Sequence, residues 1–280
     1  MLKQHINRIV VTVTVSLWLA VWGAHANTID DLTRYFQDDE LLSLAVADQQ
    51  IPALQIEPAV PLVRGIAIVL VSTQSPSLNL DTGLVLADTL KQKGWRTLLV
   101  PTDFTQALAT QSAVIDSPKP VANLLSSPID YDSYRLQIIG LVNAAYQYAN
   151  QYKGYTFIVA EGMTSAVLLD ALHNNLLSAP DTLVSIGAFW PGRQQNQALI
   201  EWLAQSTYPV LDISIPTLSH WQTATVQPRR EAAAVSLKPH YRQRMFTTNQ
   251  YHGATSTRIP GTGSVWLGQE IYSWVRYLGW

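Results

Sequence analysis

Between residues 65 and 215 the sequence alternates short apolar segments with longer segments of helical pattern, and this alternation constrains the fold most. The run "GIAIVLVS" at 65–72 is continuous, apolar and rich in β-branched residues, which is typical of a strand buried on both faces. Further strands are expected at 95–101, 155–161, 182–190 and 209–215, with helices at 80–93, 131–151, 163–177 and 194–206. Such alternation with short connections predicts right-handed βαβ units: an α/β fold with a mainly parallel central sheet between two helical layers.

The flanking regions extend this pattern. Residues 28–50 carry a loose helical stripe and are predicted to form a helix, whereas the prolines in 51–62 favour an extended strand at the sheet edge. The polar stretch 102–130 is expected to run over the surface. A helix at 227–236, a strand at 241–249 and a final helix at 264–278 complete the order. Because no repeat or linker divides the chain, residues 27–280 are predicted to form a single domain.

The first residues have the order of a secretory signal peptide. Lys3 and Arg8 precede an apolar run at 9–22, and Ala24-His25-Ala26 follows as a small-residue cleavage site. We therefore expect residues 1–26 to be removed after Ala26 and the protein to be periplasmic. The alternative is an uncleaved anchor, although the run is shorter than the ~20 residues that span a bilayer. No later stretch is long and apolar enough to span, so no membrane span is expected after cleavage.

Composition excludes several kinds of chemistry. The sequence contains no cysteine, which rules out thiol catalysis, thiolate zinc sites and iron-sulfur clusters. Removing Lys3 and Arg8 with the leader reduces 18 basic residues to 16 against 20 acidic ones, a formal charge of −4. This balance argues against a nucleic-acid partner, which needs a basic surface. The sequence also lacks metal-binding and nucleotide-binding motifs, so no metal and no cofactor are expected.

The order of segments resembles the α/β-hydrolase fold, in which a nucleophile elbow joins a central strand to the next helix. More narrowly, the chain is similar to DUF3530, a family of exported bacterial α/β-hydrolase-like proteins of unknown function, over roughly residues 30–280. The similarity lies in "RGIAIVLV", "LKQKGWRTLLVP", "YTFIVAEGMTSA", "YPVLDISIP" and "RREAA" followed by "YRQRM". None of these is a catalytic motif. The resemblance implies an α/β-hydrolase-like three-layer sandwich.

The expected elbow lacks its nucleophile. When the strand ends are matched, "VAEGMTSA" at 159–166 lies where hydrolases of this fold have Val-Gly-His-Ser-Met-Gly-Gly-Ala, so Gly162 takes the nucleophile position and Glu161 precedes it. Glycine accepts the positive φ of an elbow without steric conflict but supplies no oxygen. Two alternatives stay open: Thr164 as nucleophile in a shifted Gly-x-Thr-x-Ala register, and Ser165 one residue into the helix.

The remaining triad positions are only partly filled. Asp212 in "PVLDI" falls within a strand rather than on the loop beyond it, and a buried strand aspartate must be paired. His252 follows the last expected strand, the position of the catalytic base in this fold. Ser75, in the loop after the first buried strand, is a further candidate nucleophile. The residues expected to line the cleft are Glu161, Gly162, Met163, Ser72, Thr73 and Trp190.

Three functions are compatible with these residues. The missing nucleophile favours a non-catalytic protein, a pseudoenzyme that acts in binding or envelope assembly. The alternative is a serine/threonine-type esterase or peptidase that uses Thr164, Ser165 or Ser75 with His252 as base. A third hypothesis is an envelope protein or carbohydrate partner bound through the tryptophan-rich C-terminal half.

Overall fold

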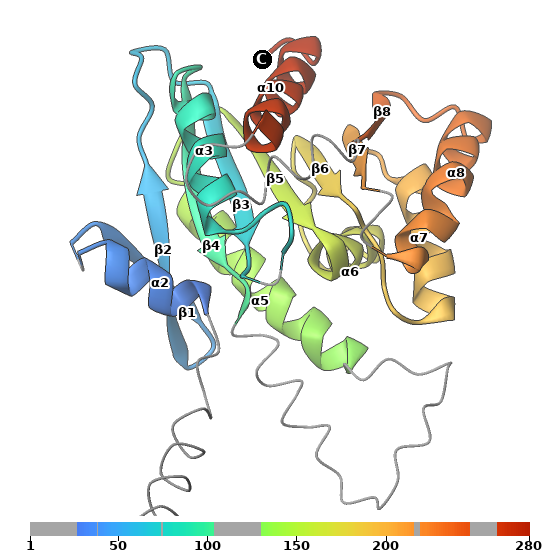
Figure 1. Cartoon of the computed structure of the whole chain (residues 1–280), viewed down its shortest axis with the longest axis horizontal. Helices are drawn as coiled ribbons and strands as arrows, with labels where there is room; N and C mark the ends of the chain where they lie inside the picture. Colours follow the sequence, from blue (N-terminus) through green and yellow to red (C-terminus); the bar gives the residue numbers. More distant parts are fainter. Residues whose placement is uncertain (1–26, 38, 74, 104–129, 216–218, 247–261) are drawn as a thin grey trace, which may run out of the picture.

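A computed structural model describes residues 27–37, 39–73, 75–103, 130–215, 219–246 and 262–280. Its centre is an eight-stranded sheet in the order β1-β2-β4-β3-β5-β6-β7-β8 (Figure 1). β1 and β2 pair antiparallel, as do β2 and β4, and all the other neighbours are parallel. The strands are β1 Leu41–Val46, β2 Gln49–Ile56, β3 Gly65–Val71, β4 Trp95–Pro101, β5 Tyr155–Glu161, β6 Thr182–Ile186, β7 Val210–Ser214 and β8 Tyr241–Met245.

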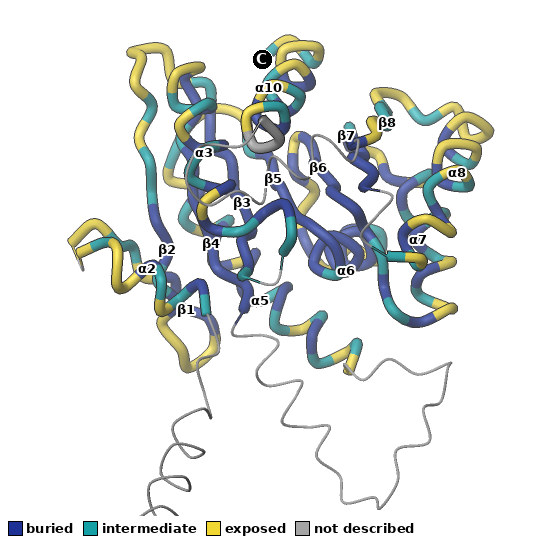
Figure 2. Tube along the Cα trace, in the orientation of Figure 1, coloured by how far each residue is buried: buried dark blue, intermediate teal, exposed yellow. Residues whose placement is uncertain are grey.

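Helices cover both faces of the sheet. They are α2 Thr28–Tyr35, α3 Leu80–Lys91, α5 Tyr131–Ala149, α6 Gly162–His173, α7 Arg193–Gln205, α8 His220–Val235 and α10 Thr262–Tyr277. One core contains buried side chains of α5, α6, α7 and α8, and the other contains those of α2, α3 and α10. Figure 2 shows the strands buried between exposed outer helix faces. The predicted three-layer sandwich with a mainly parallel sheet is confirmed.

β3 shows why the two cores form. All seven of its residues are buried. Ile66, Ile68 and Leu70 enter one core and the alternate residues enter the other, since successive strand side chains point to opposite faces. A strand of this kind needs apolar residues at every position, which is the pattern that the sequence carries.

The prediction of a helix over 28–50 is wrong beyond its first third. The helix ends at Tyr35, and 41–56 form a hairpin whose strands pair from Leu41 opposite Leu54 to Val46 opposite Gln49. In β1, Leu44 and Val46 are buried on either side of exposed Ala45, so the period is two. Leucine and alanine occur in helices as well as in strands, so the spacing of the apolar residues in 28–50 wrongly predicted a helix.

The segment predicted as an edge strand is not at the edge. β2 lies between β1 and β4, and β1 forms the outer edge. α8 also begins at His220 rather than at 227, because Ser219 caps it by accepting from the Trp221 amide, with Pro228 inside the helix. Most of the expected surface stretch 102–130 lies outside the described residues. In the described part of the chain, no helix has the length and apolar character required to cross a bilayer.

Candidate functional site

The junction of β5 and α6 has the backbone of a nucleophile elbow. The strand ends at Glu161 and the helix begins at the next residue, Gly162, which lies at φ +60° as the sequence predicts. A Cβ built on Gly162 would meet only Phe189 Cε1, at 3.5 Å, which is ordinary van der Waals contact. The position is therefore sterically open to a side chain, and the chain places none there.

The Glu161 carboxylate is turned into the fold. Glu161 is 4% exposed. Its carboxylate oxygens accept hydrogen bonds from the amides of Ser77 (3.2 Å) and Leu78 (2.7 Å) and from Ser77 Oγ (2.5 Å). Burial raises the pKa of Glu161 to about 7, although hydrogen bonds from Ser77, Leu78 and Ser75 partly oppose this shift. Glu161 thus bridges the carboxyl end of β5 and the loop that follows β3.

This bridge lies where the sheet order reverses. β4 is on one side of β3 and β5 is on the other. In open α/β sheets, ligands bind at such a switch point, outside the carboxyl ends of the strands. Hydrolases of this fold take one oxyanion-binding amide from the loop between β3 and the following helix. Here the last amides of that loop, from Ser77 and Leu78, donate to Glu161.

A second carboxylate, Asp103, holds the other end of the same loop. It lies two residues after β4, is buried, and accepts from the Thr73 amide (3.1 Å) and Thr73 Oγ1 (3.0 Å). The Thr28 amide donates to it at 2.7 Å, and the hydroxyls of Thr28 and Ser72 also bind it. Ser72 and Thr73, expected to line the cleft, are therefore bound to an acid that the sequence analysis missed. The position of Asp103 just past the carboxyl end of a predicted strand could have indicated that it belongs to the site.

The hydroxyl groups of α6 have partners in the core. Ser165 is 0% exposed and its Oγ donates to Ser185 Oγ at 2.8 Å. Thr164 is also buried, and its Oγ1 lies 2.8 Å from the Tyr134 hydroxyl. Within the described residues neither hydroxyl is bound to a histidine or a carboxylate. The neighbouring Met163 is half-buried and packs on the α5–α8 core.

Asp212 is buried in the middle of β7. Its Oδ2 lies 3.2 Å from Arg229 Nε and accepts from the Tyr241 hydroxyl (2.9 Å) and Gln243 Nε2 (3.0 Å). Arg229 Nη1 also donates to the Ala188 carbonyl, so the pair ties α8 to β7, to β8 and to the segment that follows β6. Asp212 is thus paired, as expected of a buried strand aspartate. His252 lies outside the described residues, and a base at that position stays a prediction.

Trp190 belongs to the core rather than to an exposed binding face. It is 1% exposed, and its ring packs edge-on against Tyr131 at 4.6 Å and lies 5.7 Å from Tyr134.

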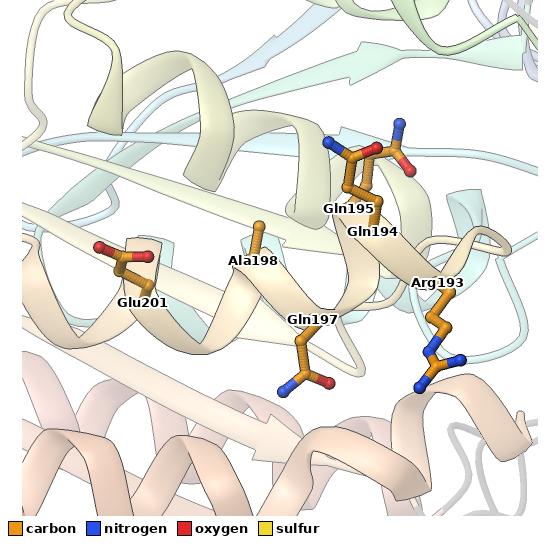
Figure 3. A pocket seen from close by; sticks show the side chains of 6 residues that line it. All are labelled: Arg193, Gln194, Gln195, Gln197, Ala198 and Glu201. Atoms are coloured by element: carbon orange, nitrogen blue, oxygen red, sulfur yellow. The ribbon is translucent and has the colours of Figure 1, made fainter.

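A surface hollow of about 710 Å³ lies over α7 (Figure 3). Its lining residues are Arg193, Gln194, Gln195, Gln197, Ala198 and Glu201, and none of the predicted site residues is among them. Among the residues that the structure describes, no cluster of three or more His, Asp or Glu side chains could hold a metal ion.

The sheet order and the β5–α6 elbow define the α/β-hydrolase fold. An esterase domain from a Rhodothermus marinus protein matches with a TM-score of 0.57 and 12% identity, over 85% of this chain and 97% of that chain. A putative dienelactone hydrolase from Klebsiella pneumoniae matches with a TM-score of 0.55 and 13% identity (84% and 96%). A serine hydrolase homologue from Coxiella burnetii matches with a TM-score of 0.51 and 10% identity (87% and 99%). Such low identities establish the fold alone.

Within this class the chain belongs to the DUF3530 family, described as proteins of unknown function, whose sequence model matches residues 32–257. No curated protein matches the chain.

Proposed function

We propose that this protein is a non-catalytic member of the α/β-hydrolase class that is exported to the periplasm and acts there by binding. The observation that carries the proposal is the Glu161–Gly162 pair. Glycine stands at the nucleophile position with the elbow's positive φ, and the preceding carboxylate accepts from the amides of Ser77 and Leu78.

Acyl transfer on this fold needs an attacking oxygen and preorganised donors aimed at the developing oxyanion. Gly162 supplies no oxygen. The Ser77 and Leu78 amides already donate to the Glu161 side chain, so these donors are not free to bind a developing oxyanion. Gly162 thus lacks the attacking oxygen and Glu161 occupies the amide donors, whereas the backbone at the β5–α6 junction still has the conformation of an elbow.

A hydrolase built on Ser75 is the alternative that the geometry favours over Thr164 and Ser165. Ser75 is half-buried rather than buried, and its side chain makes a hydrogen bond to Glu161, whose pKa near 7 suits a general base. This alternative would use Glu161 in place of a histidine or together with His252.

Hydrolysis of p-nitrophenyl acetate and butyrate tests the proposal. The chain from Asn27 onward contains every element that the structure describes and is compared with its Ser75→Ala, Thr164→Ala and Ser165→Ala variants. We expect all four proteins to release p-nitrophenol at the rate of the buffer. A rate well above buffer that is lost in one variant alone would contradict the proposal and identify the nucleophile.

Export has its own test. When the full chain is expressed in a bacterium and the periplasm is released by osmotic shock, we expect a mature protein there that begins at Asn27. An intact mass that retains residues 1–26, in the membrane fraction, would contradict the predicted cleavage.

A further inference from the structure

A loop at the opposite end of the sheet from the elbow exposes a continuous apolar run. The five residues "AVPLV" at 59–63, called the apolar loop below, are all exposed, and Leu62 is 68% exposed. The loop joins β2 to β3 and stands out from the sheet beside the start of β3 (Figures 1 and 2). Since β3 and β5 are parallel, the elbow at the end of β5 lies at the other end. Isolated exposed apolar residues are ordinary, but a run of five is not.

The apolar loop is held in place. The Ala59 amide donates to the Lys91 carbonyl (3.0 Å), and Arg64 donates through its amide to the Gly94 carbonyl (2.8 Å) and through Nε to the Lys93 carbonyl (3.0 Å). Gly94 lies at φ +86°, and a Cβ there would come within 2.3 Å of the Leu62 carbonyl oxygen. The loop therefore packs on the turn after α3, and its side chains are exposed by a fixed backbone.

Aromatic and basic side chains surround the apolar loop. Tyr155, at the start of β5, is exposed and stacks on Trp280 with ring centroids 4.3 Å apart, and its amide donates to the Arg64 carbonyl. Four basic residues near the loop, called the basic rim, are Arg64, Lys91, Lys93 and Lys153. None of the four forms an ion pair with another described residue. The acids beside them are Asp88 on α3, Asp181, which accepts from the Thr156 amide, and Glu57 before the loop, which is paired with Arg96.

We propose that this end of the sheet docks on an anionic lipid surface, with Val60, Leu62 and Val63 entering the boundary between headgroups and acyl chains. Proteins that lie on a membrane combine apolar side chains at that boundary with basic residues that attract anionic headgroups, and aromatic rings favour the same depth. The whole chain has a formal charge of −2, so a rim of four unpaired basic residues is a local concentration of positive charge. The inference does not depend on the elbow, which would face away from the bilayer.

Co-sedimentation with vesicles tests the proposal, using the chain from Asn27 onward so that the apolar leader is absent. Vesicles of phosphatidylcholine are compared with vesicles that also contain phosphatidylglycerol. We expect binding to the anionic vesicles that weakens with added salt. Leu62→Asp should lower the affinity about tenfold or more, and Lys91→Glu with Lys93→Glu should remove the preference for anionic vesicles.

Leu136→Asp is the matched control, because Leu136 is 66% exposed and lies near the start of α5, and this helix starts at the elbow end of the sheet in Figure 1. It should bind vesicles as the wild type does, and thermal melts should show all the variants folded. Absent binding, equal binding to neutral vesicles, or an equal loss in Leu136→Asp would overturn the proposal. So would a wild-type dimer in light scattering that Leu62→Asp dissociates without any vesicle binding, since the loop would then contact protein.

Discussion

Replacing Glu161 with glutamine should change how the stability of the protein depends on pH. Burial raises the pKa of this carboxyl from 4.5 to about 7, so between these values the folded chain holds a proton that the unfolded chain has released. A pKa raised on folding gives stability that is fully present below pH 4.5 and is lost as the pH rises through 7. The difference between the two pKa values corresponds to about 3 kcal/mol.

Glutamine suits this test because it keeps the shape and most of the hydrogen bonds. Its oxygen can accept from the Leu78 amide, and its NH₂ can donate to Ser77 Oγ, which accepts as readily as it donates. The variant has no proton to lose, so its stability should not carry the slope that Glu161 causes in the wild type.

Urea unfolding followed by tryptophan fluorescence, at several values between pH 4 and pH 8, measures the effect. The free energy of unfolding of the wild type, minus that of Glu161→Gln, should fall by about 3 kcal/mol across this range. A difference that stays constant with pH would show that Glu161 keeps its ordinary pKa in the folded chain. The reasoning about its buried environment would then be refuted.

Other substitutions test the neighbouring contacts. Gly162→Ser should fold and lose about 1–2 kcal/mol in urea unfolding, because only the positive φ opposes a side chain there; a larger loss would mean that the elbow is sterically closed. Asp103→Ala should lose about 2–4 kcal/mol and speed amide hydrogen exchange at Thr28, whose N–H it binds; unchanged exchange would contradict that anchor. Arg229→Met should lose about 3–5 kcal/mol by leaving Asp212 without its ion-pair partner, and Asp212→Asn in that background should recover part of the loss. No recovery would mean that packing, rather than charge, dominates there.

The strands and helices of the sheet's central part could be predicted because each signal is local. β3, β4 and β5 carry their apolar runs within single segments, and the elbow lies where one such run meets small residues. β1 could not be predicted in the same way, although 51–62 was expected to be extended and contains most of β2. The alternation of β1 is carried by leucine and alanine, and its pairing with β2 makes the strand period prevail.

The contacts of Glu161 and Asp103 with the loop after β3 could not be predicted from the sequence, for a different reason. Gly162 and Glu161 could be assigned to the elbow from sequence, but the partners of Glu161 are 83 and 84 residues away in the chain. Asp103 contacts Thr28 across 75 residues. These contacts depend on β3 lying between β4 and β5, and no periodicity within a segment reports that order.

Labelling by a fluorophosphonate probe tests the absence of a nucleophile most directly. The purified chain from Asn27 onward is incubated with the probe and its intact mass is measured, with a serine esterase as the positive control. The account predicts no adduct on this chain, because Gly162 has no oxygen and Ser165 is buried against Ser185. A single stoichiometric adduct that disappears in Ser75→Ala, Thr164→Ala or Ser165→Ala would contradict it.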